Sequence, residues 1–144
     1  MSALSLETAQ SIALSTLKAG RDRGFKPLSV AVYDERAALK VLLSDDGTSL
    51  KRAEIAMGKA HGALAMGLGS RALHKMAMDR PYFVAAVTHA VGGLLVPVPG
   101  GVLIKDSQGN ILGAVGVSGD TSDNDEIAAA AGIEAAGLAY DAGA

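Results

Sequence analysis

Cysteine and tryptophan are absent from this 144-residue sequence, and only 3% of its residues are aromatic. Without a thiol the chain can form no disulfide, no thiolate metal site and no cysteine nucleophile. The lack of cysteine also fits a reducing compartment. The first residues have neither the cationic start nor the apolar run of a secretory signal peptide. We therefore expect a cytoplasmic protein.

The sequence also lacks a strong charge of one sign and a long hydrophobic run. Its 13 basic and 15 acidic residues leave a formal net charge of −2. There is no basic stripe, and the aromatic side chains are too few to stack bases, so we expect no nucleic-acid partner. No uninterrupted apolar run approaches the ~18 residues that a membrane span needs, so we expect no membrane partner either.

Small apolar residues are abundant instead. Hydrophobic residues make up 49% of the chain, and glycine contributes 18 residues. Small side chains let helices and strands approach closely, but each element then has little area to bury by itself. This composition favours a homo-oligomer, in which the domain completes its burial against copies of itself. A compact, alanine-rich monomer remains the alternative interpretation.

The predicted elements follow one another without a linker, a low-complexity tract or an internal repeat, which indicates one domain over residues 1–144. Helices are predicted from helical spacing and capping residues, and strands from short apolar runs bounded by turn residues. The predicted helices cover residues 5–23, 49–67, 71–78, 81–91 and 126–140, with Ser122 or Asp123 capping the last. The predicted strands cover residues 28–33, 39–44, 94–98, 102–105 and 111–117.

These strands arrive in antiparallel clusters and do not alternate with helices. The pattern therefore favours an α+β fold, in which helices pack on a single antiparallel sheet of about five strands, in the order α-β-β-α-α-β-β-β-α. Pro97 should place its strand at an edge of the sheet or end it. The glycines of residues 113–119 indicate close backbone packing, because the Gly-Lys-Ser/Thr ending of a phosphate-binding loop is missing.

Five segments carry a resemblance that runs along essentially the whole chain. Residues 30–34 read Val-Ala-Val-Tyr-Asp, and the second helix holds Arg52-Ala, Ala56 and Lys59-Ala. Residues 100–104 read Gly-Gly-Val-Leu-Ile, and the most specific stretch, residues 111–119, reads Ile-Leu-Gly-Ala-Val-Gly-Val-Ser-Gly. Residues 123–126 read Asp-Asn-Asp-Glu before an alanine-rich helix. In this order the segments resemble the GlcG/HbpS-like family of haem-binding and haem-degrading domains.

The resemblance implies a profilin-like antiparallel sheet flanked by helices, and assembly into rings or octamers. It also implies a small-molecule ligand. Some relatives bind or handle haem, some are domains attached to corrinoid enzymes, and others accompany catabolic pathways. Haem is therefore the cofactor that the family suggests.

His61, on the second predicted helix, is the candidate haem ligand. None of the three histidines has a metal-binding spacing such as His-x-x-x-His, so we predict no metal site. A single histidine can still ligate a haem iron axially. A satisfied or exposed histidine without a function is the simpler interpretation.

Arg52 and Lys59 are the candidate binding cations. They are seven residues apart and so share a helix face, where two cations can hold the propionates of haem or a dicarboxylate metabolite. A solvated face on which Arg52 or Lys51 pairs with Glu54 fits equally well.

Four carboxylates, those of Asp120, Asp123, Asp125 and Glu126, gather where the last helix begins. Their spacing does not match a calcium-binding loop. Carboxylates stabilise helix N-termini by capping and through the helix dipole, and this is the role we expect for them.

Three functions stay open at this point. The first is haem or tetrapyrrole binding, with His61 as ligand and with Arg52 and Lys59 holding the propionates. The second is an enzyme of a catabolic pathway that acts on a small carboxylated metabolite at a subunit interface, with His61 or Asp34 as general acid or base. The third is an accessory structural oligomer without catalysis.

Overall fold

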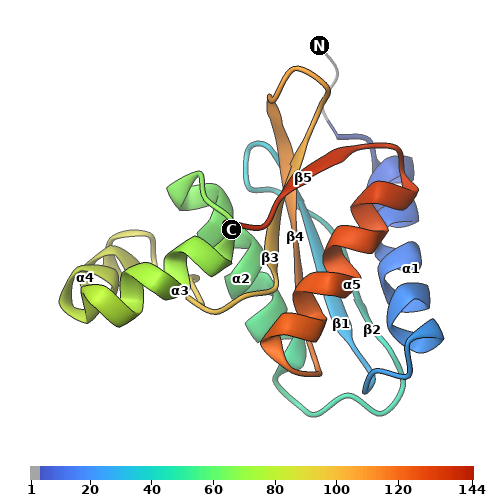
Figure 1. Ribbon diagram of the computed structural model, residues 1–144, viewed down its shortest axis with the longest axis horizontal. Helices are drawn as coiled ribbons and strands as arrows, with labels where there is room; N and C mark the ends of the chain where they lie inside the picture. Colours follow the sequence, from blue (N-terminus) through green and yellow to red (C-terminus); the bar gives the residue numbers. More distant parts are fainter. Residues whose placement is uncertain (1–3) are drawn as a thin grey trace.

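The computed structural model describes residues 4–144, which form one antiparallel sheet with helices on both of its faces (Figure 1). This confirms the predicted α+β class and the five-stranded sheet. In chain order the elements are α1 (Leu6–Asp22), β1 (Ser29–Asp34), β2 (Leu39–Ser44), α2 (Arg52–Met66), α3 (Ser70–Asp79), α4 (Pro81–Ala90), β3 (Gly101–Lys105), β4 (Ile111–Ser118), α5 (Ser122–Ala135) and β5 (Ala139–Asp141).

The strand order β2-β1-β4-β3-β5 puts the most apolar strands inside the sheet. β1 pairs with β4 from Ser29 opposite Ser118 to Asp34 opposite Gly113, and every residue of β1 is buried. β2 lies at an edge, and its residues are exposed or only half-buried. β1 is an almost continuous apolar run because both of its edges are paired and both of its faces are covered.

The two faces of the sheet are covered differently. α1 and α5 lie side by side on one face, where larger side chains such as Ile12, Val115 and Ile133 fill the core. On the other face α2 packs through alanines, among them Ala56 and Ala60. Small side chains on this face bring α2 close to the strands that it crosses.

Gly116 marks the closest approach between α2 and the sheet. A Cβ atom built on this residue would lie 1.9 Å from the carbonyl oxygen of Ala56 and 2.8 Å from the amide nitrogen of Ala60. No side chain fits there, because real Cβ contacts are far longer. The prediction that the glycines of β4 serve close backbone packing is confirmed at this position.

α3 and α4 project away from the sheet (Figure 1). Their own small apolar cluster is built on Leu73, Val84 and Leu95. Much of α4 is exposed, including Tyr82. No helix within residues 4–144 has both the length and the apolar character needed to cross a bilayer.

The predicted strand at residues 94–98 is wrong. This segment is irregular and packs on the outer side of α2, where the Val96 amide donates to the carbonyl oxygen of Gly58 and the Leu95 side chain covers Gly62. The fifth strand is instead β5, which pairs with β3 at the C-terminal end of the chain. The segment from β2 to β3 holds three helices, as the predicted helix ranges have it, and the shorter order α-β-β-α-α-β-β-β-α had merged two of them.

The last helix is also displaced from its predicted bounds. It begins at Ser122 and ends at Ala135, and its N-cap is Thr121, whose hydroxyl accepts from the amide of Asn124 at 3.1 Å. Gly137, with a φ of 75°, turns the chain out of the helix and frees β5 to join the sheet. Alanine spacing alone could not locate this stop, because alanine also fits a continuing helix.

Candidate functional site

Helix α2 carries all three candidate binding residues, Arg52, Lys59 and His61. It begins without a side-chain cap at Lys51 and ends at Gly67, which adopts the left-handed conformation. Because α2 lies between the sheet and the 94–98 segment, side chains one or two positions apart reach very different surroundings.

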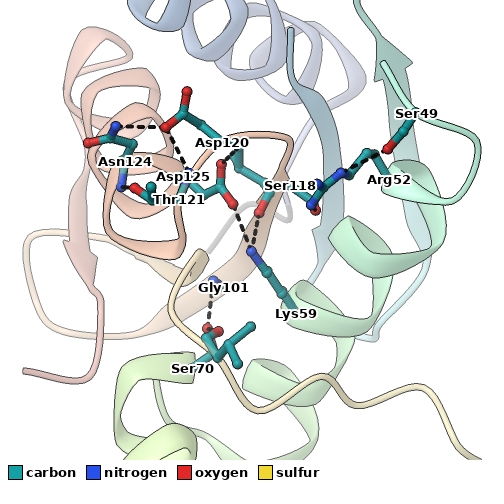
Figure 2. Close-up of polar contacts among 12 residues, drawn as sticks. Ser49, Arg52, Lys59, Ser70, Gly101, Ser118, Asp120, Thr121, Asn124 and Asp125 are labelled. Atoms are coloured by element: carbon teal, nitrogen blue, oxygen red, sulfur yellow. Dashed lines mark hydrogen bonds and ion pairs between the residues drawn. The ribbon is translucent and has the colours of Figure 1, made fainter. Parts of the chain in front are cut away.

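Lys59 is buried in an ion pair with Asp125 at the start of α5 (Figure 2). Its Nζ lies 3.0 Å from Oδ2 of Asp125 and donates to the carbonyl oxygen of Val117 at 2.8 Å. The other carboxylate oxygen of Asp125 accepts from the amide of Asp120 at 2.9 Å. Both side chains are only 2% exposed. The Lys59 ammonium therefore ties α2 to β4 and α5 and is not presented to solvent.

Burial dominates the electrostatics of this pair. Desolvation lowers the pKa of Lys59 and raises the pKa of Asp125, while the attraction between the two groups opposes both shifts. The nearby Arg52 charge lowers the pKa of Lys59 further. Burial by itself favours the neutral form of each group, and the attraction between the two groups favours their charged forms.

Arg52 lies at the N-terminal end of the same helix face, but it reaches a different environment. Its Nε donates to the hydroxyl of Ser49 at 3.0 Å and its Nη1 to the hydroxyl of Ser118 at 3.2 Å (Figure 2). Arg52 also lines an open cleft of about 190 Å³ between the start of β1, the end of β4 and the loop before α2. Sharing a helix face thus did not give Arg52 and Lys59 a shared site.

His61 lies on another side of α2, between the sheet and the 94–98 segment. Its Nδ1 lies 2.9 Å from the carbonyl oxygen of Leu94, and the edge of its ring meets the Tyr33 ring at a centroid distance of 5.9 Å. A carbonyl oxygen can only accept, so Nδ1 carries the hydrogen and the lone pair of the neutral ring stays on Nε2. Met57 and Leu64 occupy the same side of the helix, four residues before and three residues after His61.

The structure does not bring His61 together with the two cations. At roughly 100° per residue, Arg52 and His61 lie about 180° apart around α2. Lys59 and His61 lie about 160° apart by the same count. A ligand held by the His61 ring therefore lies on the side of α2 opposite both cations of the same chain.

Asp34, the alternative general acid or base, is held in the β1–β2 turn. Its Oδ1 accepts from the amides of Arg36 and Ala38 at 2.9 and 3.0 Å, and the Arg36 guanidinium lies 3.6 Å from Oδ2. Burial alone would raise the pKa of Asp34, but these hydrogen bonds and the Arg36 charge together lower it. Asp34 follows Tyr33 along β1, so its side chain leaves the opposite face of the sheet from the one that His61 contacts.

The four carboxylates at the start of α5 interact with different partners, some with cationic side chains and some with backbone amides. Arg71 of α3 pairs with Asp123 and Glu126, and Lys59 pairs with Asp125. The side-chain cap of α5 comes from Thr121. Sequence reasoning missed the role of Asp125, because Lys59 lies 66 positions away and only the packing of α2 and α5 around the end of β4 joins them.

Comparison with known proteins identifies the family of this chain. A model described as "Haem degrading protein HbpS-like" matches residues 4–134. The solved structure of HbpS is 27% identical with a TM-score of 0.80, and the match covers 94% of this chain and 91% of HbpS. No curated protein matches the chain.

Two further solved structures share the fold at lower identity. PduOC, solved as a haem complex, is 22% identical with a TM-score of 0.84, and the match covers 96% of this chain and 98% of PduOC. ORFY from Klebsiella pneumoniae is 19% identical with a TM-score of 0.81, and the match covers 92% and 90% of the two chains. The family model spans nearly all of the described residues, and the chain therefore belongs to the haem-degrading, HbpS-like family.

Proposed function

We propose that this protein binds haem or a related tetrapyrrole, with His61 as the ligand to the metal. The observation that carries the proposal is the hydrogen bond from Nδ1 of His61 to the Leu94 carbonyl. Metal-ligating histidines commonly donate their second ring N–H to a carbonyl or carboxylate, which fixes the tautomer and the ring orientation. Within residues 4–144, Nε2 of His61 makes no hydrogen bond.

The surroundings of His61 also suit a macrocycle. The Tyr33 ring lies against the imidazole, and Met57 and Leu64 provide apolar surface on the same side of α2. When bound, a haem supplies an iron with an open axial position for an imidazole nitrogen. The membership of the family and the PduOC complex with haem support the same ligand class.

The position of the cations changes how the propionates would be held. Because Arg52 and Lys59 lie across α2 from His61, the same chain cannot use all three at one haem. We propose that His61 alone of this set acts as a haem ligand, that Lys59 stabilises the fold, and that cations for the propionates come from other residues or another copy of the chain.

We also propose that the protein is a cytoplasmic homo-oligomer, with the octamer of the family resemblance as the expected assembly. Leu39 and Leu42 on the edge strand β2 are 45% and 37% exposed, and Leu50 is 87% exposed. In the sheet register Leu39 and Leu42 stand opposite Tyr33 and Ala31, on the face that α2 covers only in part. Contact between copies would remove this apolar surface from water.

A haemin titration tests the ligand, with absorbance followed at the Soret band. We expect a sharpened Soret band at a fixed ratio of haem to chain, and its loss in His61→Ala. His89→Ala is the matched control, because His89 is exposed on α4. Equal haem binding by wild type and His61→Ala would refute the role of His61, and a flat titration of the folded wild type would refute haem as the ligand. Native mass spectrometry of the same samples gives the number of chains.

A further inference from the structure

A small cationic cleft at one end of the sheet is not used by the proposed haem site. It has a volume of about 190 Å³ and is lined by Lys26, Pro27, Gly47, Thr48, Ser49, Arg52 and Gly119. A tetrapyrrole is far too large for the cleft, so any occupant is a small molecule or one end of a larger one.

Two positive side chains line the cleft without a carboxylate partner. Neither Arg52 nor Lys26 forms an ion pair within residues 4–144. Two carboxylates are next to lining residues in the sequence, those of Asp46 and Asp120, and neither lines the cleft. The Asp120 carboxylate already accepts from the amides of Lys26 and Thr121 and from the side chain of Asn124. The lining therefore carries positive charge and no carboxylate.

The guanidinium of Arg52 is oriented in advance. Nε and Nη1 each donate to a serine hydroxyl, and one of these serines, Ser118, is fully buried at the end of β4. A guanidinium has five N–H groups and only two of them are used within residues 4–144, so three donors remain for a ligand. A guanidinium group that is already held in one orientation loses little conformational entropy when it binds a planar or tetrahedral oxyanion.

Neutral donors complete the lining. Thr48 and Ser49, which both carry hydroxyls, line the cleft, and their backbone amides donate to no acceptor within residues 4–144. These residues lead directly into α2, whose first turn has no side-chain cap. The partial positive charge at this helix end adds to that of Arg52 and Lys26.

We propose that this cleft binds a small oxyanion, the carboxylate or phosphate group of a metabolite, with Arg52 as the principal contact and Lys26, Thr48 and Ser49 as supporting contacts. The site is separate from His61 and independent of the proposed haem function. An oxyanion is the occupant that the lining selects, because every polar side chain in it can donate a hydrogen bond and none carries negative charge.

Isothermal titration calorimetry tests the proposal with sodium malonate and sodium phosphate as probes, at constant ionic strength in sodium chloride. We expect saturable binding of at least one probe to the protein, and the probe that binds more tightly tells whether carboxylate or phosphate is the natural group. Arg52→Gln should weaken binding about tenfold or more, and Lys26→Gln about threefold, because charged hydrogen bonds are lost.

Lys51→Gln is the matched control. It removes the same charge one position from Arg52, but Lys51 pairs with Glu54 and does not line the cleft. Its effect should stay below about twofold, since exposed charges are screened by salt. Lys26→Gln keeps the test valid if Arg52→Gln fails to fold, because the Lys26 side chain makes no hydrogen bond within residues 4–144.

Two outcomes would overturn the proposal. One is the absence of saturable binding of either anion at about 20 mM, well above the range of metabolite affinities. The other is an equal effect of the two cleft variants and of Lys51→Gln. His61→Ala should leave anion binding unchanged, so a failure of the haem proposal and a failure of this one are distinguishable.

Discussion

Replacing Lys59 by methionine should destabilise the protein severely at neutral pH. Methionine keeps most of the volume of the side chain but leaves the Asp125 carboxylate buried without its cation. Breaking a buried pair by removing one partner costs about 3–5 kcal/mol. A domain of this size has a total stability of about 5–15 kcal/mol, so the loss is a large fraction of it.

The loss should depend on pH in a defined direction. In Lys59→Met the pKa of Asp125 in the folded state, already raised by burial, loses the ammonium that holds it down. The unfolded state then releases the proton near its usual pKa of about 3.9, while the folded state keeps it. Stability is therefore highest below about pH 4 and falls as pH rises through the raised pKa of the folded state. The variant should be nearest to wild type in acid.

The complementary variants complete a double-mutant cycle. Asp125→Leu leaves the ammonium buried alone and should cost a similar amount at pH 7, with recovery at alkaline pH because burial lowers the pKa of Lys59. The double variant Lys59→Met with Asp125→Leu removes both charges. It should lie within about 1–4 kcal/mol of wild type and can be the more stable protein, as for other buried pairs replaced by apolar residues.

Urea unfolding followed by circular dichroism measures these free energies at pH 4, 7 and 9, at two protein concentrations so that any assembly equilibrium is visible. A loss below about 1 kcal/mol in Lys59→Met, with no dependence on pH, would mean that the pair does not hold charge in the folded protein. A double variant as unstable as either single variant would show that the side chains matter through their hydrogen bonds to Val117 and Asp120 more than through their pairing.

Three shorter predictions concern packing, capping and assembly. Gly116→Ala should destabilise by about 1–3 kcal/mol or more, measured by urea unfolding, because its Cβ would collide with the Ala56 carbonyl and α2 would have to move. Thr121→Ala should lower the free energy of unfolding by about 1 kcal/mol in the same assay, because the amide of Asn124 loses its hydrogen-bond acceptor. An unchanged free energy of unfolding would mean that another acceptor replaces the threonine hydroxyl. Leu42→Lys should shift native mass spectra towards smaller assemblies by placing charge on the exposed edge strand, and an unchanged spectrum would remove β2 from the interface.

Local sequence patterns predicted most of the sheet. β1 and β4 are nearly continuous apolar runs bounded by turn residues, so their existence followed from hydrophobicity. Short connections predicted the antiparallel pairing of β1 with β2 and of β3 with β4, but not the pairing of β1 with β4. Residues 94–98 are just as apolar, and yet they cover the outer side of α2. A short apolar run buries itself equally well against a sheet or a helix. Gly58 and Gly62 open α2 to Val96 and Leu95 of this segment, and Pro97 weighs against a strand interior.

The candidate site was harder to predict for a related reason. Helical spacing placed Arg52 and Lys59 on one face, and they do share it, but spacing carries no information on what covers that face. Ser118 meets one end of it and Asp125 meets the other, so one cation borders an open cleft and the other is sealed in the core. Both partners come from 66 positions further along the chain, beyond the reach of any local pattern.

The geometry of α2 gives a direct way to separate the two proposed ligands. His61 and Arg52 lie about half a turn apart around the helix and nine residues apart along it, about 13.5 Å at 1.5 Å per residue. A haem at His61 and an oxyanion at Arg52 therefore should not compete. In haem-saturated protein, malonate or phosphate should bind with the same affinity as in haem-free protein. Competition between the two would require both to meet at one interface between copies of the chain, with Arg52 of one copy reaching the haem at His61 of another.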